Sequence, residues 1–570
     1  MKIRLIAALL ACCALAAGEK PSAAKKTPGK TETVSPNQSP GVEAAIPDPV
    51  KALGEPAMMV FPNGIQMAVT ATTENVQAHV NQGMNHLHGG WEFEASRHFA
   101  AAMREDPDCL LAHWGMLMSL LSASPETDQA RIAVTARLLD LIDQGKGSTL
   151  ERGYAYGLVK YIEEGPEGAS NAFRKVAAQF PNDLQASIFA ALFSRSGYDE
   201  FGTATPDQEA AEKGLLTLIA NNPQNPLPLN ALLTIRAEAP DLGPSLDLAR
   251  KLCQIAPGYG PYSHLLGHYE WRCGNHAKAA SAFGLASSYF EGWMKKNKAT
   301  VEDCPEWVKA ECYRIVALVS KGEFETSYAA ARQIAATPLP KTRGASPGVR
   351  LLMWDAKTLP ARILLNRGFK GNASEALLSL PKPDDLIGTL QKSLAFWWID
   401  GLRLALEAQR LIDEGKISDA QDVVAALTHH GESMSESQAA AAASGERSAW
   451  TRAFRALEVI ASDLRGRIAL AGPKAEMGTA YNWFSSATDR QHPSPMLFPP
   501  MVLTPMAIHL GEFYLSVNKP QDAIESYQRA LTSFPNNIHA LVGLKNAYGK
   551  ANRPNDVSAT EKKIQELTAE

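Results

Sequence analysis

From residue 72 onward, apolar residues recur every three or four positions, in segments of roughly 12–18 residues. Short runs of Gly, Pro, Asn and Asp separate these segments, and such residues end helices. Because residues three and four apart share one face of an α-helix, the pattern predicts a long series of helices joined by short turns. Aromatic residues make up only 7% of the chain, which favours closely packed helices over a β-sandwich. We therefore expect an all-α protein.

Two segments before this series differ from it. Residues 17–56 are rich in Pro, Lys, Ser, Thr and Gly and have little apolar periodicity, so they are predicted to be a flexible, disordered linker. Residues 58–69, MMVFPNGIQMAV, place Pro-Asn-Gly between two apolar runs. That arrangement predicts either a β-hairpin or an extended entry into the first helix.

One set of spacings recurs inside the helical part. A small residue is followed by Ala after twelve positions, an aromatic after four more, a second Ala after three and Pro after five. The first copy is Gly83, Ala95, Phe99, Ala102 and Pro107. The second copy is Gly157, Ala169, Phe173 and Pro181, with Val176 in place of the second Ala, and the fullest copy is Gly511, Tyr514, Ala523, Tyr527, Ala530 and Pro535. A partial copy is Gly267, Ala279, Phe283 and Ala286.

These spacings describe a helical hairpin. The offsets of four and three place Ala, the aromatic ring and Ala on one face of the second helix, where the small side chains let the first helix approach. The glycine on the first helix gives the matching close approach, and the proline ends the unit because it cannot continue the helix. A 34-residue helix–turn–helix with these positions is the tetratricopeptide repeat (TPR). We therefore predict a TPR-like helical-hairpin solenoid, with an N-terminal TPR region at 57–210, a degenerate TPR-like region at 211–470 and a C-terminal TPR region at 471–570.

The first residues, MKIRLIAALLACCALAAGEK, combine two basic residues, an apolar run and an Ala-Leu-Ala site. This pattern predicts an export signal over residues 1–16, because the apolar run is too short to cross a bilayer. Leu9-Leu10-Ala11-Cys12 also resembles a bacterial lipobox, so a lipoprotein signal with a lipid anchor at Cys12 stays an alternative. No later segment has the length and apolarity of a membrane-spanning helix, so we expect an exported protein of the bacterial periplasm or envelope.

Over residues 57–570 the chain resembles a family of long, exported bacterial TPR proteins. The resemblance is carried by the DPDC and WGM elements after the first repeat, by SHLLGHYEWRCGNHAKAASAF (263–283), by LPARILLNRGFKGNASEALLSLPKP and by PPMVLTPMAIHLGEFYL. It implies a scaffold fold in the cell envelope and no established reaction. The chain departs from the family where further histidines are expected, in NPQNPLPLNALLTIR (222–236), which has none.

Histidines are the main candidates for binding chemistry. His264 and His268 lie one helical turn apart, so both rings could face one metal ion or one small ligand, or could pack within a helix–helix contact. Leu265 occupies the place of the Glu in an H-E-x-x-H zinc site. His86 and His88, with His79 one heptad earlier, are expected on a solvated or helix-packing face, and His429-His430 before Gly431 is expected to mark a helix end.

No combination of residues indicates an enzyme. Gly344-Ala345-Ser346-Pro347-Gly348 matches G-x-S-x-G, but no strand pattern precedes it and Pro follows the Ser, so it is predicted to be a loop. No phosphate-binding loop is present, we expect no cofactor, and a net charge of −4 gives no electrostatic reason to expect nucleic acid. We therefore expect a non-enzymatic scaffold or adaptor that binds a protein or peptide in a TPR groove. The alternative is a metal- or small-ligand-binding envelope protein, or a metal-dependent hydrolase, that uses His264 and His268.

Overall fold

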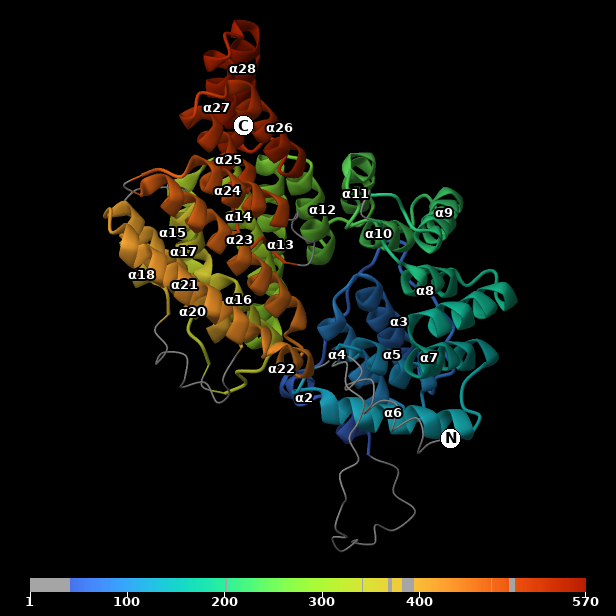
Figure 1. Ribbon diagram of the computed structural model, residues 1–570. Helices are drawn as coiled ribbons and strands as arrows, with labels where there is room; N and C mark the ends of the chain where they lie inside the picture. Colours follow the sequence, from blue (N-terminus) through green and yellow to red (C-terminus); the bar gives the residue numbers. More distant parts are fainter. Residues whose placement is uncertain are drawn as a thin grey trace, which may run out of the picture. The chain divides into compact units, whose positions relative to one another are not determined.

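The computed structural model describes residues 41–122, 124–199, 202–340, 342–366, 372–381, 394–472, 474–491 and 498–569. The described residues are mainly helical and contain no strand beyond one isolated bridge between Tyr198 and Ala204 (Figure 1). Within them, no helix is both long enough and apolar enough to cross a membrane. The expected all-α class is confirmed.

The chain forms two compact units. One comprises Met1–Asp241, Asp247–Pro257 and Ala442–Gly445, and the other comprises Leu242–Leu246, Gly258–Ala441 and Glu446–Glu570. The expected boundaries near residues 210 and 470 concern repeat regions rather than compact units, and they stay predictions. We call these bodies unit 1 and unit 2 and describe each by itself.

Unit 1 is built from successive helices that pack against their neighbours in the chain. Its elements are η1 (Val42–Ala45), α2 (Asp48–Ala52), α3 (Glu74–His88), α4 (Glu92–Glu105), α5 (Leu110–Ser119), α6 (Asp128–Asp143), α7 (Thr149–Gln179), α8 (Leu184–Ser194), α9 (Pro206–Asn221) and α10 (Pro226–Ile235). Helices α11 (Gly243–Ile255) and α22 (Gln438–Ala443) each contain one of the points where the chain passes between the units.

Unit 2 repeats the same design. Its elements are α12 (Gly260–Arg272), α13 (His276–Asn297), η2 (Val301–Asp303), α14 (Pro305–Lys321), α15 (Phe324–Ala335), α16 (Pro347–Trp354), η3 (Ala356–Thr358), α17 (Leu359–Asn366), α18 (Asn372–Ser379), α20 (Ala395–Asp413), α21 (Ile417–Ser435), α23 (Arg447–Ala471), α24 (Met477–Arg490), α25 (Met506–Ser516), α26 (Pro520–Ser533), α27 (Ile538–Lys550) and α28 (Pro554–Ala569). The four C-terminal helices, α25 to α28, pack in sequence order.

The aromatic residue of each predicted repeat lies against the glycine of the preceding helix. A Cβ added to Gly83 would stand 2.7 Å from the Phe99 ring, and one added to Gly511 would stand 2.8 Å from the Tyr527 ring. Gly157 stands in the same relation to Phe173, at 2.8 Å. The helix ends are regular too: α4, α7 and α26 each stop two residues before the proline, at Pro107, Pro181 and Pro535. This packing makes the chain a TPR-type series of helical hairpins.

The second repeat turns inside α7. Gly165 has a φ of 75°, a left-handed conformation that glycine adopts without strain, and Pro166 follows it. Pro is favoured at the first position of a helix because it has no amide hydrogen to satisfy. The Gly165-Pro166 pair therefore ends one helix and begins the next within what is a continuous helical range.

The last part of the expected disordered linker is ordered instead. Residues 42–52 form η1 and α2, and Ala45, Ile46 and Val50 are buried in the core of unit 1. These three apolar side chains are too few to give a periodicity in the sequence, but they are enough to fix a short helix on a preformed surface. Residues 1–40, with the predicted export signal and Cys12, lie outside the described residues.

Residues 58–69 form the extended entry rather than the hairpin. Side chains on one face of α3 hold their backbone: Gln77 Oε1 accepts a hydrogen bond from Val69 N at 2.8 Å, Asn81 Oδ1 from Met67 N at 3.2 Å and Asn85 Oδ1 from Ile65 N at 3.1 Å. The accepting side chains recur every four residues on the helix. The backbone N–H groups that they bind recur every two residues on the extended segment. Four residues of helix and two residues of extended chain both span about 6 Å, so each side chain on α3 lies opposite one backbone N–H group.

Candidate functional site

An open groove of about 880 Å³ lies in unit 2 between α21, α23 and α24. Its lining includes apolar side chains from all three helices or their ends, and charged or polar groups at its edges: Ile417, Ser418, Gln421, Val424, Ala425, Thr428, His429, Glu432, Arg465, Ile468, Ala469, Gly472, Lys474, Glu476, Thr479 and Trp483. A concavity that combines apolar side chains with polar groups is a candidate binding site. We call this concavity the α21–α24 groove.

Arg465 is the most distinctive side chain of the groove. Its guanidinium stacks on the Trp483 ring, 4.6 Å from the ring centroid, and donates a hydrogen bond to Thr428 Oγ1. No carboxylate among the described residues forms an ion pair with it. Burial and the neighbouring Arg490 lower the pKa of Arg465, and both causes mean that its charge is incompletely compensated. A fixed guanidinium of this kind is suited to a carboxylate from a bound partner.

His429 and His430 lie within α21 rather than at a helix end. Helix α21 runs through His429-His430-Gly431 to Ser435, so the helix end expected at Gly431 is wrong. His429 is exposed at the edge of the groove, and His430 Nε2 lies 2.7 Å from the Trp397 carbonyl oxygen. The bond to Trp397 is a contact with α20, which a sequence pattern within one helix does not reveal.

His268 is fully buried on α12, His264 is partly buried one turn earlier, and both are surrounded by aromatic rings. Both contact the Tyr313 ring, at centroid distances of 5.7 and 5.8 Å, and His264 also contacts Phe283. Burial lowers the pKa of His264 to about 3 and that of His268 well below its usual value, so both rings are neutral at pH 7. Among the described residues, these two histidines do not belong to any group of three potential metal ligands. Their surroundings therefore match the alternative in which the two rings pack within a helix–helix contact.

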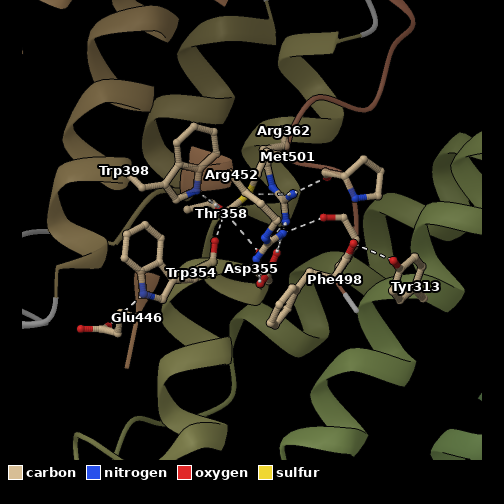
Figure 2. A network of polar contacts seen from close by, with 12 residues as sticks. Tyr313, Trp354, Asp355, Thr358, Arg362, Trp398, Glu446, Arg452, Phe498 and Met501 are labelled. Atoms are coloured by element: carbon tan, nitrogen blue, oxygen red, sulfur yellow. Dashed lines mark hydrogen bonds and ion pairs between the residues drawn. The ribbon is translucent and has the colours of Figure 1, made fainter. Parts of the chain in front are cut away.

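A second group of polar side chains in unit 2 is buried and holds an irregular segment in place (Figure 2). Arg362, which is fully buried, donates to the carbonyl oxygens of Pro500 and Asp355, each at 2.8 Å. Arg452 bonds the Asp355 carboxylate at 3.1 Å and the Pro499 carbonyl oxygen at 2.9 Å. Tyr313 donates to the Phe498 carbonyl oxygen at 2.6 Å. The network satisfies the backbone of residues 498–500, where prolines prevent a helix.

Tryptophans of the same region belong to the protein interior. Trp354 and Trp398 are buried, and their indole nitrogens donate to Glu446 and Thr358, at 2.9 and 3.1 Å. Ser346, the serine of the G-x-S-x-G match, is also buried and accepts a hydrogen bond from Val349 N as the N-cap of α16. These contacts give all three residues a structural role.

A third group of polar residues lies in unit 1. Ligand atoms of His86, Glu94 and His98 all lie within 4.8 Å of one another, and all three residues are buried. The sequence singled out His86 but not Glu94 or His98, because the turn between α3 and α4 separates them and no single-helix spacing links them. The only local signal was the four-residue spacing of Glu94 and His98, which is common in helices.

Comparisons with known proteins do not assign the chain to a family. No protein-family model matches it, and no curated protein matches it. Among solved structures, the "P58(IPK) TPR Domain" aligns over 84% of this chain and 99% of its own, with 14% identity and a TM-score of 0.20. The "APC/C hetero-tetramer Cut9-Hcn1" aligns over 74% and 94%, with 13% identity and a TM-score of 0.24. Scores this low carry no argument about function, so the TPR-type assignment rests on the packing of the individual hairpins.

Proposed function

We propose that this protein is a non-enzymatic scaffold that binds an extended segment of a partner protein in the α21–α24 groove. The observation that carries this proposal is the open groove itself, with an Arg465 guanidinium held on its wall without a carboxylate partner among the described residues. An acidic side chain or a C-terminal carboxylate of the partner would complete that interaction, and apolar side chains would fill the space beside Val424 and Ile468.

Unit 1 provides an internal precedent for this kind of binding. The extended residues 58–69 lie on α3, where Asn and Gln side chains bond their backbone. Gln82 Nε2 and Gln77 Nε2 donate to the carbonyl oxygens of Met59 and Met67, at 2.6 and 2.5 Å. Helix α3 thus binds an extended segment, and its side chains bond both the N–H donors and the carbonyl acceptors of that segment's backbone.

The test is a photo-crosslinking experiment in cells with the full-length protein. A photoreactive phenylalanine analogue is placed at Gln421 or Thr479 in the groove, and at Leu285, an exposed residue of α13, as the control. We expect a discrete crosslinked partner from the two groove positions and none from Leu285. Arg465→Gln should weaken the purified interaction roughly fivefold or more, since removing an arginine anchor from an interface typically costs over 1 kcal/mol. Equal crosslinking at all three positions, or none in the groove, would rule the proposal out.

The same cells can be used to determine where the protein is located. We propose that the protein is exported to the bacterial periplasm or envelope, on the support of the basic and apolar N-terminal sequence. Fractionation should place the protein outside the cytoplasm, and mass spectrometry of its mature N-terminus distinguishes cleavage near Ala16 from lipid attachment at Cys12. An intact N-terminal Met1 in a cytoplasmic fraction would contradict export.

A further inference from the structure

Helices α3 and α4 bring three potential metal ligands together inside unit 1. His86 lies near the end of α3, and Glu94 and His98 lie one turn apart on α4, so the hairpin turn folds the two helices onto the same point. Their ligand atoms are at most 4.8 Å apart. Tetrahedral ligands about 2.0–2.2 Å from a zinc ion lie roughly 3.4 Å from each other. Binding therefore draws the three side chains together and turns the rings of His86 and His98, which are stacked at an interplanar angle of 16°.

His98 carries an unsatisfied nitrogen at this point. The residue is fully buried, and its Nε2 has no hydrogen-bond partner among the described residues. Its Nδ1 lies 3.0 Å from Nδ1 of His79, which leaves Nε2 as the nitrogen able to face an ion. A buried polar atom without a partner costs free energy, and ligation of a metal is one way of recovering it.

The surrounding residues resemble the outer shell of a metal site. Arg97 Nη1 donates to Glu94 Oε2 at 2.7 Å, and Arg97 Nη2 donates to the Gly54 carbonyl oxygen at 2.8 Å. His79 contacts the far nitrogen of His98. In metal sites, partners of this kind fix the orientation of a ligating carboxylate and of a ligating imidazole.

A cavity lies one residue away from the three side chains. This cavity, of about 270 Å³, is lined by His79 and Arg97, together with Asn75, Glu55, Glu105 and other residues. His79 lines this cavity and also contacts Nδ1 of His98.

We propose that His86, Glu94 and His98 bind one divalent transition-metal ion, with zinc as the best match to two imidazoles and one carboxylate in a tetrahedral arrangement. The site is separate from the α21–α24 groove and does not depend on the proposed scaffold function. It also differs from the pair His264 and His268, which the sequence put forward as metal ligands.

The experiment uses the full-length protein without a polyhistidine tag. After expression in zinc-containing medium, elemental analysis should find about one equivalent of zinc per chain. After removal of the metal with a chelator, Co²⁺ should restore one equivalent of binding, with the visible absorption of tetrahedral Co²⁺. Zn²⁺ should raise the melting temperature of the metal-free protein.

Variants then locate the ion. Glu94→Gln and His98→Gln should each abolish stoichiometric binding, and His79→Gln should weaken it roughly 10–100-fold as a positioning change. The double variant His264→Gln/His268→Gln is the matched control and should bind the metal as the wild type does. A wild-type protein that takes up neither Zn²⁺ nor Co²⁺ overturns the proposal, whether or not the variants fold. Loss of metal in the double control, or its retention in His98→Gln, overturns it as well.

Discussion

At the scale of single residues, glycines opposite aromatic rings control how closely the helices approach. The Tyr527 ring lies between two such glycines, Gly511 on α25 and Gly543 on α27. Gly115 stands in the same relation to Phe99, because a Cβ there would be 2.2 Å from the ring. The repeat pattern in the sequence predicted the first glycine of each pair. It did not include the second, which belongs to the next hairpin.

Gly543 and Gly549 on the same helix, α27, allow a direct test of this packing. A Cβ at Gly543 would lie 2.2 Å from the Tyr527 ring, whereas nothing lies within 4 Å of a Cβ at Gly549. Gly543→Ala should therefore lower the free energy of unfolding by about 1–3 kcal/mol through overpacking. Gly549→Ala should raise it by about 0.5–1 kcal/mol, because alanine favours the helix. Chemical denaturation measures the free energy of unfolding of each variant. An equal change in the two variants would show that the ring does not control how closely the helices approach.

At the scale of elements, α3 has a different partner on each of two faces. Gln77, Asn81 and Asn85 bind the extended segment 58–69, while Gly83 meets Phe99 of α4. The periodicity of α3 was visible in the sequence, but the sequence analysis did not single out its amide residues. Their role became apparent only with the extended segment in place.

The amide contacts predict a specific loss of order. Asn81→Leu removes the acceptor for Met67 N and adds an apolar side chain that cannot replace it, so residues 58–69 should detach from α3 while the helices remain folded. Limited proteolysis should then cleave this segment several-fold faster. The control is Gln179→Leu, at an exposed position near the end of α7, which should leave the cleavage rate unchanged. Unaltered cleavage in Asn81→Leu would mean that the amide bonds do not hold the segment.

One hairpin shows why the middle of the chain was described as degenerate. A Cβ at Gly466 on α23 would lie 2.8 Å from the Phe484 ring on α24, which is the contact seen in the regular repeats. Glycine and ring are eighteen residues apart here, against sixteen in the three clearest repeats. The two extra residues lengthen the helix or its turn without changing the packing. A pattern of fixed spacing therefore misses a hairpin that has the same geometry.

At the scale of the whole molecule, both units bury neutral histidines. Burial lowers the pKa of His86 and His264 to about 3, and that of His88, His113 and His276 to about 4. The usual value, about 6.5, applies in the unfolded chain. Above that pH, neither state is protonated at these sites. Below it, the unfolded chain takes up protons that the folded chain excludes, so the stability of the fold decreases as the pH falls.

We expect the protein to lose stability in mild acid. Each buried histidine should cost up to about 1.4 kcal/mol per pH unit between about pH 6.5 and its lowered pKa. In urea unfolding of the metal-free protein, the urea concentration at the midpoint should therefore fall steadily from about pH 7.5 to 6 and 5. His264→Leu should reduce this slope, and substitution of the exposed His429 should not. A midpoint that is constant between pH 7.5 and pH 5 would contradict the expectation.

The sequence alone determined the helices, their pairing into hairpins and the positions of the closest helix contacts in the regular repeats. These features follow from local rules, because offsets of three and four residues define a helix face and a proline ends it. The tertiary structure decided which polar residues meet. His86 reaches Glu94 and His98 across a turn, and the α21–α24 groove combines three helices from residues 417 to 483. Such meetings depend on the tilt and register of packed helices, which the packing of many side chains sets together and no short spacing encodes.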